Sequence, residues 1–258
     1  MPHIFNRLAI MEESRALMKS GSVSPMKFTL LFVVVNGVLS ALTSVVEYSA
    51  AIGPRVGFSF LSLSFVGILS YLISTVLTAG YKCFCLGIHR REEMPYDSLF
   101  DGFAFAGKCI GLMVLESLYV FCWSMLFFFP GIIATFRYSF AMWNLCDDPD
   151  LGVFRALELS KRQTRGYKFQ LFLLYLQFLP FYLLVFAVSM LYGTYIYPLL
   201  PATLIGAVAD ALISSVISGC FGIFLMPYVN LSVCGFYLRA TGKYGEDGAQ
   251  QSNRCGEI

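Results

Sequence analysis

Charged side chains are scarce in this sequence, and histidine is almost absent. Among 258 residues, 13% are charged, 57% are hydrophobic and two are histidine. Soluble globular proteins have about 25% charged residues, and a water-soluble fold of this length could not bury so much apolar surface. The composition also excludes a disordered chain, a collagen-like chain, a small disulfide-stapled domain and a soluble nucleic-acid-binding protein. The class that remains is an integral membrane protein.

Charge is absent from several long stretches of the chain. Residues 28–46 and 56–81 contain no charged residue, and residues 109–129 contain one. A helix needs about 20 apolar residues to cross a bilayer, whereas barrel strands would give alternating segments of about 10 residues. The sequence therefore predicts an all-α, polytopic helical bundle, a single domain over 1–240 with six transmembrane helices. The predicted spans are 28–47, 56–81, 109–129, 131–146, 169–192 and 202–226.

Positive charges are distributed unevenly between the predicted loops. The N-terminal tail, the second loop, the fourth loop and the C-terminal tail together hold 16 lysines and arginines, whereas the loops between them hold one, Arg55. Such an excess is typical of cytoplasmic segments. We therefore expect both termini in the cytoplasm, with a flexible polar tail over 241–258. The first apolar run is long enough to cross the membrane, so we expect it to be retained rather than cleaved as a signal peptide.

Three charged residues fall well inside the predicted spans, where charge is costly and often functional. At 1.5 Å per residue, Arg137 and Asp210 lie about 10 Å and about 14 Å from the outer ends of their helices. Because their charges are opposite and their depths similar, we predict an Arg137–Asp210 ion pair. Glu116 is expected nearer the cytoplasmic end of the third helix. A buried neutralising pair is the favoured interpretation, and a substrate or proton site is the alternative.

A basic segment follows the predicted fourth span. Asp148 and Pro149 are typical of a helix start, and Gly166 is a typical helix stop. The pattern predicts an amphipathic cytoplasmic helix over 149–165. The apolar residues expected to be buried are Leu151, Phe154, Leu157 and Leu159. The cations expected to contact anionic lipid headgroups are Lys161, Arg162, Arg165 and Lys168. An ordinary orientation signal without lipid specificity explains the same cations.

The eight cysteines lie in predicted spans or on the predicted cytoplasmic side, where thiols stay reduced. No CxxC pair is present. Cys83 and Cys85 with His89 could form one corner of a metal site, but small apolar thiols at a helix end are the favoured interpretation. We therefore expect no metal and no cofactor.

Several elements in order resemble a bacterial family of integral membrane proteins, the domain of unknown function 975. The resemblance is strongest over 97–180, and it implies a bacterial inner-membrane location and a six-helix layout. The group is distantly similar to the membrane domain of some glycerophosphodiester phosphodiesterases. It carries no agreed activity, so no catalytic residue can be transferred. The matching elements are Asp97–Phe103, Phe129–Ile133, Arg137–Ser139, Asp147–Pro149, Ala156–Ser160 and Gly166–Lys168.

No catalytic motif is present in the sequence. There is no Walker loop, no HExxH, no GxSxG and no clustered carboxylates. We therefore expect a protein that is not an enzyme: a non-catalytic membrane module that organises lipid or assists an unidentified membrane protein. Its expected partners are membrane lipids with anionic headgroups, and no nucleic acid. The alternative is a transporter or export-associated permease that uses Arg137 and Asp210, and a lipid-handling enzyme is the third hypothesis.

Overall fold

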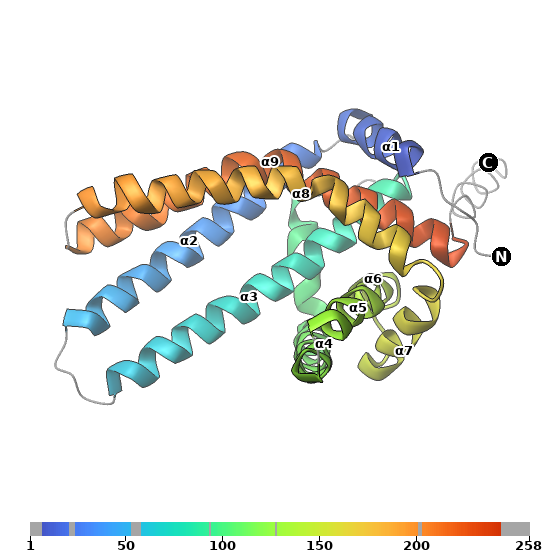
Figure 1. The fold of residues 1–258 in the computed structure, drawn as a ribbon, viewed down its shortest axis with the longest axis horizontal. Coiled ribbons are helices and arrows are strands. Elements are labelled where there is room, and N and C mark those ends of the chain that lie inside the picture. Colours follow the sequence, from blue (N-terminus) through green and yellow to red (C-terminus); the bar gives the residue numbers. More distant parts are fainter. Residues whose placement is uncertain are drawn as a thin grey trace. The chain divides into compact units, whose positions relative to one another are not determined.

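The computed structural model describes residues 7–20, 24–52, 58–92, 94–126, 128–200 and 203–243 (Figure 1). Within these ranges the regular elements are helices, and no strand is present. The predicted all-α class is therefore confirmed. The elements are α1 (Arg7–Ser20), α2 (Pro25–Ile52), α3 (Phe58–His89), the 3₁₀ helix η1 (Tyr96–Phe105), α4 (Ala106–Leu126), α5 (Phe128–Tyr138), α6 (Ala141–Asp147), α7 (Val153–Gln163), α8 (Lys168–Leu191), the π-helical turn η2 (Tyr192–Ile196), the 3₁₀ turn η3 (Tyr197–Leu199) and α9 (Leu204–Thr241).

Five helical segments of the described chain are long and apolar enough to cross a membrane, as in a multi-pass membrane protein. About 20 helical residues are needed to cross the hydrocarbon core, and each segment exceeds that length. Residues 244–258, most of the predicted tail, lie outside the described residues. The five segments are Pro25–Val46, Phe65–His89, Tyr96–Met125, Lys168–Leu199 and Gly219–Thr241.

The predicted fourth span, 131–146, is divided between α5 and α6. These helices have 11 and 7 residues, each too few to cross a bilayer alone. The Ser160 hydroxyl donates to the Arg137 carbonyl at 2.9 Å and accepts from the Phe140 amide at 3.2 Å. A side chain that takes over backbone groups in this way interrupts the helical ladder. This interruption explains why five segments qualify rather than the six expected.

The helices group into two compact units. Unit 1 comprises Met1–Pro25, Val76–Gln177 and Tyr228–Ile258. Unit 2 comprises Met26–Thr75 and Phe178–Pro227. Unit 1 therefore contains α4 and the shorter helices α5 to α7, whereas unit 2 contains most of α2 with segments of α3, α8 and α9.

Unit 1 has a protein core centred on α6. Residues 141–145 are all buried. The ring of Tyr237, on α9, packs against Phe140 at 5.4 Å and against Trp143 at 6.3 Å between ring centroids. A seven-residue helix is marginal in isolation, and burying large aromatic rings contributes strongly to stability. We infer that α6 is helical because the surrounding core holds it.

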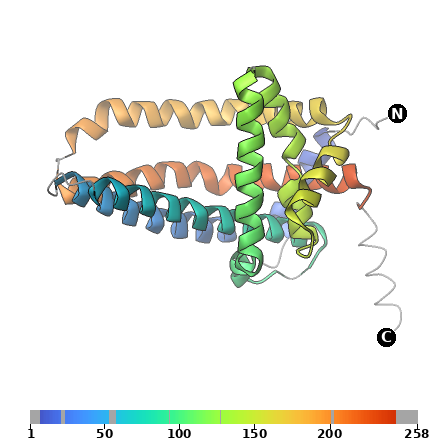
Figure 2. The same cartoon turned by 90° about the horizontal axis from the view of Figure 1, so that it is seen from below.

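A helical hairpin forms one side of unit 1. α4 and α5 pack against each other, with the rings of Tyr119 and Tyr138 stacked at 5.6 Å. Lys108, near the start of α4, donates to the carbonyl of Pro149, just after α6, at 2.5 Å. The chain therefore returns after α6 to the end at which α4 begins. Figure 2 shows that, within unit 1, α4 runs across the direction of the last part of α3 and the last part of α9.

Unit 2 is joined by neutral polar side chains. Ser74 donates to the amide oxygen of Asn36 at 2.7 Å, and the hydroxyls of Thr43 and Ser70 lie 3.0 Å apart. These contacts connect α2 to α3 with no buried charge. Large apolar side chains spaced by four residues are exposed along α2: Val34, Val38 and Leu42. Such a face is suited to lipid, since helices in membranes associate through small and polar residues rather than through apolar ones.

Candidate functional site

The predicted amphipathic helix is present as α7, but it begins later than expected. It starts at Val153 rather than near Pro149. The Asp148 carboxylate accepts from the amide of Asp150 at 3.1 Å, so it caps the preceding turn and not the helix. The predicted stop is confirmed, because Gly166 has a φ of 93°, a left-handed conformation that glycine adopts readily.

One face of α7 is buried in unit 1. It consists of Ala156, Leu157 and Ser160. The prediction that Phe154 is buried is wrong, since this ring is 70% exposed. At 100° per residue, Phe154 lies about 120° around the helix from Ser160. The buried face is therefore narrower than the sequence pattern indicated.

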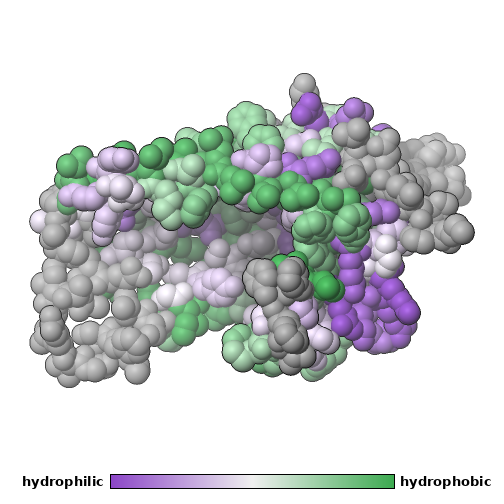
Figure 3. Space-filling view, viewed as in Figure 1, coloured by the Kyte–Doolittle hydropathy of each residue, from purple (hydrophilic) through white to green (hydrophobic). Residues whose placement is uncertain are grey.

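The outward face of α7 is cationic. The exposed cations are Arg155, Lys161 and Arg162 on the helix and Arg165 just after it. Figure 3 shows strongly hydrophilic surface over this helix. Arg162 pairs with Glu158 at 2.5 Å, but both side chains are largely exposed, so the pair contributes little. The face keeps an excess of positive charge.

Arg137 lies where α5 meets α7. Its carbonyl accepts hydrogen bonds from the hydroxyls of Ser160 at 2.9 Å and Thr164 at 3.2 Å. Ser160, on α7, and Thr164, directly after it, are both buried. Their hydroxyls satisfy a carbonyl at the end of α5 that has no partner within the helix. The guanidinium of Arg137 lies 5.7 Å from the ring centroid of Tyr138. Arg137 is therefore held against the basic helix.

Three cations from α5, α7 and α8 meet at this junction. Phe136, beside Arg137, packs against Phe172 of α8 at 5.8 Å, one helical turn from Lys168. Arg137 and Lys161 are both close enough to Lys168 to repel its charge. None of the three cations forms an ion pair with a carboxylate of the described residues. We call Arg137, Lys161 and Lys168 the basic cluster.

A second charged arrangement in unit 1 surrounds Asp147. Its side chain is only 5% exposed and pairs with Arg90, at the end of α3, and with Lys243, after α9. The Tyr237 hydroxyl donates to the same carboxylate at 3.3 Å. Burial alone would raise the pKa of Asp147, but the hydrogen bonds and charges of Lys243 and Arg90 outweigh it and lower the pKa. The ionised carboxylate joins α3, α6 and the end of α9.

Neutral hydrogen bonds extend this arrangement to α7. The amides of Asn144 and Gln163 exchange two hydrogen bonds of 2.9 Å, and Asn144 also accepts from Tyr237 at 3.0 Å. The sequence alone did not single out these residues, because Asp147 stands beside the predicted helix start at Asp148 and Asn144 stands in an apolar run. Their spacing of three, which places both on one helical face, is the signal that could have found them.

Residues 128–243, just under half of the chain, match the family model described as Protein of unknown function (DUF975). This segment belongs to that family. The DUF975 segment contains the whole basic cluster, α7 and Asp147, but not Arg90. The predicted resemblance is thereby confirmed, although the match begins after the predicted element at 97–103. No curated protein and no solved structure gives a significant match. The more distant resemblance to the phosphodiesterase membrane domain stays a prediction.

The other predicted intramembrane charges have neighbours of their own. Asp210, in the DUF975 segment, accepts a hydrogen bond from the Tyr192 hydroxyl at 2.7 Å within unit 2. Glu116 precedes the segment and lies within electrostatic reach of Lys82 in unit 1. Arg137 belongs to unit 1 and Asp210 to unit 2. The Arg137–Asp210 pair stays a prediction.

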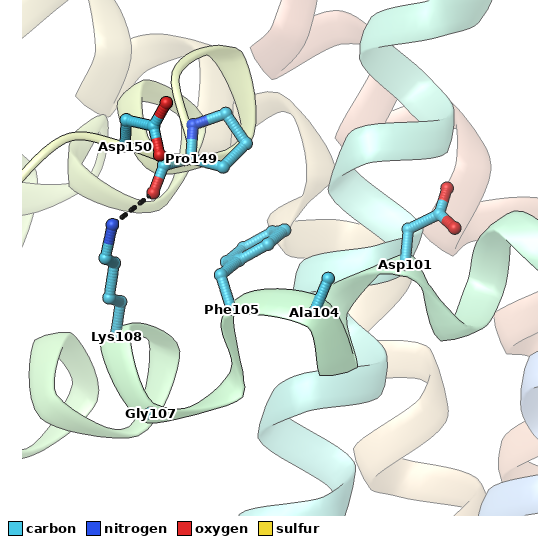
Figure 4. Close-up of a pocket in the computed structure, with 7 residues that line it drawn as sticks. All are labelled: Asp101, Ala104, Phe105, Gly107, Lys108, Pro149 and Asp150. Atoms are coloured by element: carbon cyan, nitrogen blue, oxygen red, sulfur yellow. Dashed lines mark hydrogen bonds between the residues drawn. The ribbon is translucent and has the colours of Figure 1, made fainter.

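An open pocket of about 540 Å³ lies beside the start of α4. Figure 4 shows the Lys108 amine reaching the Pro149 carbonyl, with Asp101 and Asp150 on opposite sides of Phe105. The two carboxylates therefore do not converge on one point. Within the described ranges, no group of three histidine, cysteine, aspartate or glutamate side chains is placed to hold a metal ion.

The cysteines of the described residues are free thiols, and Cys255 lies outside those residues. A hydrogen bond with Cys83, together with burial, raises the pKa of Cys146, on α6, well above its usual value. A nitrogen of the His89 ring lies 2.9 Å from the Leu231 carbonyl on α9. This ring therefore joins α3 to α9.

Proposed function

We propose that this protein is a non-catalytic membrane module that organises anionic lipid around α7. The observation that carries the proposal is the division of α7 into two faces, one buried in unit 1 and one presenting exposed cations. Each cation near an anionic surface contributes about 1 kcal/mol of attraction. The exposed ring of Phe154 suits the interface between water and lipid. A fixed face with these groups attracts anionic headgroups without any bond being made or broken.

The place of α7 in the chain supports this proposal. Lys168, five residues after its end, begins the apolar segment Lys168–Leu199. A basic helix that leads directly into a membrane-spanning helix is expected at the level of the headgroups. The excess of positive charge on this side supports a cytoplasmic location in a bacterial inner membrane.

The α4–α6 hairpin supports our inference that both termini lie in the cytoplasm. The contact between Lys108 and Pro149 brings the start of α4 close to the turn after α6. The chain therefore leaves this hairpin at the same end at which it entered. That holds whether or not the hairpin enters the bilayer. The other four apolar segments belong to α2, α3, α8 and α9. An even number of crossings leaves both ends of the chain on one side.

The contacts of the buried carboxylate Asp147 favour a structural role over a catalytic role. A general acid or base must exchange a proton with a substrate within hydrogen-bond reach. The Asp147 carboxylate is instead occupied by Arg90, Lys243 and Tyr237. We therefore infer that the protein is not an enzyme. An unidentified membrane protein with an acidic surface is the other partner that the cationic face of α7 suits.

The proposal is tested by measuring which lipids surround the full-length protein in a bilayer. The protein is reconstituted with phosphatidylcholine and phosphatidylglycerol, and the relative association of spin-labelled forms of the two lipids is measured. We expect the wild type to enrich phosphatidylglycerol. A variant with Arg155, Lys161, Arg162 and Arg165 all changed to glutamine should lose most of this enrichment, and raised salt should weaken it in the wild type.

Glu158→Gln is the matched control, because it removes a negative charge from the same face. It should raise the enrichment of phosphatidylglycerol slightly. Equal association of the two lipids with the wild type, or enrichment that is the same in all variants, contradicts the proposal.

A further inference from the structure

We infer that the basic cluster, Arg137, Lys161 and Lys168, is a binding site for one phosphate group, carried by the headgroup of an anionic lipid. This inference rests on the proposed function, since it names the chemical group that the basic side of the module binds. It differs from that function in locating a specific site, made by three helices, instead of a diffuse attraction to a charged surface.

The backbone holds the three cations together. The end of α5 is fixed to α7 by the hydrogen bonds from Ser160 and Thr164 to the Arg137 carbonyl, and Lys161 follows Ser160 directly. α5 is fixed to α8 by the contact of Phe136 with Phe172. The cluster therefore does not depend on flexible side chains alone, since two independent contacts bring its three helices to one place.

Like charges at close range repel, and no carboxylate in the part of the chain that the structure describes pairs with these three cations. The Glu158 carboxylate on the same helix is engaged by Arg162 at 2.5 Å, and the Asp147 carboxylate is engaged by Arg90 and Lys243. Elsewhere in unit 1 the chain pairs its partly buried cations, as Arg239 pairs with Glu13 at 2.5 Å. Three cations assembled without a counter-charge from the described residues are the arrangement that an external anion completes.

The chemistry of the three side chains favours phosphate. A guanidinium donates two parallel hydrogen bonds to a phosphate or carboxylate, and two ammonium groups add charge and further donors. A phosphate monoanion offers several acceptor oxygens to three donors, whereas a carboxylate offers two. The neighbouring apolar segment begins at Lys168, so the site is placed where the acyl chains of a lipid could lie beside α8 while its phosphate meets the cluster.

The test uses the full-length protein in an uncharged detergent, where no charged surface exists and only a specific site retains lipid. The probes are phosphatidylglycerol, diacylglycerol with the same chains but no phosphate, and inorganic phosphate. Binding is followed by native mass spectrometry and by the shift in the thermal unfolding midpoint. We expect phosphatidylglycerol, but not diacylglycerol, to bind and to stabilise the protein, with affinity falling roughly tenfold for each cation changed to glutamine.

The matched control removes the same number of positive charges outside the cluster, from α7 and the turn that follows it, as Arg155→Gln, Arg162→Gln and Arg165→Gln together. Loss of binding in the R137Q, K161Q and K168Q triple variant but not in this control supports the site. If inorganic phosphate competes with phosphatidylglycerol and stabilises equally, the phosphate site stands and free phosphate is its ligand.

Other outcomes overturn the inference and separate it from the proposed function. Equal loss in both triple variants removes the site but leaves a diffuse attraction to anionic lipid. Binding that is independent of the phosphate group, or unchanged in the cluster variant, removes the site outright. If the R137Q, K161Q and K168Q triple variant does not fold, lipid binding is measured in K161Q and in R137K instead. K161Q removes an exposed charge, whereas R137K keeps the charge but loses the paired donors.

Discussion

Units 1 and 2 use polar side chains in opposite ways. Unit 1 buries an ionised carboxylate, Asp147, with two cations and a tyrosine hydroxyl. In unit 2 the described hydrogen bonds between helices involve neutral groups or one carboxylate, Asp210, bound to Tyr192. Among the side chains that the structure describes, ten of the twelve largest fully buried ones belong to unit 1 and two, Phe28 and Phe178, to unit 2.

This difference shows where the protein supplies its own interior and where lipid replaces it. A buried ion pair is favourable only when the surrounding structure fixes its geometry, and the aromatic core around α6 provides that framework. The helices of unit 2 expose apolar side chains instead. Polar substitutions should therefore have large effects in unit 1, and loss of single hydrogen bonds should have small effects in unit 2.

The largest effect is expected from Asp147→Asn. This change leaves Arg90 and Lys243 without their carboxylate, and removing one member of a buried ion pair costs about 3–5 kcal/mol of folding free energy. The free energy of unfolding of purified protein in detergent measures the loss. Asp150→Asn, at an exposed position, is the control and should change it by about 0.5 kcal/mol or less. Equal stability of the two variants would mean that the Asp147 pairs do not hold unit 1 together.

A somewhat smaller effect is expected from Gly102→Ala. A Cβ atom on Gly102, in η1, would meet the backbone carbonyl of Val76 and the amide of Gly80 on α3. Overpacking of this kind costs about 1–3 kcal/mol, or more where backbone must move. Gly107→Ala is the matched control, because a Cβ there meets nothing within 4 Å, and alanine favours a helix by up to about 1 kcal/mol. The two variants should therefore shift the thermal midpoint in opposite directions.

Acid should weaken unit 1 through Asp147. The folded state lowers the pKa of this carboxylate, so its contribution is complete above the pKa of the unfolded chain, about 3.9. It is lost as the pH falls from about 4 through the lower folded-state pKa. The unfolding midpoint of the wild type should fall more steeply below about pH 4 than that of Asp147→Asn. Parallel curves for the two proteins would show that Asp147 does not carry the acid sensitivity.

Local patterns in the sequence predicted the parts of the fold that depend on neighbouring residues. Long apolar runs gave the helical class, and the basic amphipathic pattern identified α7 and its stop at Gly166. The division of the predicted fourth span depends instead on Ser160, which lies 23 residues from the carbonyl that it binds. Asp147 finds its two cations 57 and 96 residues away. Hydropathy and helical periodicity contain no information about such partners.

Arg137 shows the same limit at the candidate site. Its distance along the helix from Gly131 suggested a residue inside a span with a distant carboxylate as partner. The contacts of the α5 end with α7 and α8 place it near Lys168, and the ion pair with Asp210 stays a prediction. Lys161 and Lys168 were predicted as lipid contacts from charge alone, but their meeting with Arg137 depends on tertiary packing.

The smallest effect is expected from the hydrogen bond between Tyr192 and Asp210 in unit 2. Interhelical hydrogen bonds in membranes contribute about 0.6 kcal/mol on average. Tyr192→Phe and Asp210→Asn should each cost about this much, and a double-mutant cycle should show that they are coupled. Tyr195→Phe, whose ring is 69% exposed, is the control and should be silent. Additive single effects would show that the hydrogen bond does not stabilise unit 2.

Exchanging the charges of Arg137 and Asp210 distinguishes the two roles considered for Arg137, as part of a phosphate site and as part of an ion pair. If Arg137 serves the phosphate site, exchanging the charges of Arg137 and Asp210 should not rescue the loss caused by either single reversal, because each residue has a different partner. Rescue by the exchange would instead support the predicted ion pair. A flux assay in reconstituted vesicles compares the wild type with Asp210→Asn and tests the transporter alternative. Solute flux that occurs in the wild type and is abolished in this variant would favour that alternative. Tyr192 and Asp210 would then be the first residues to examine.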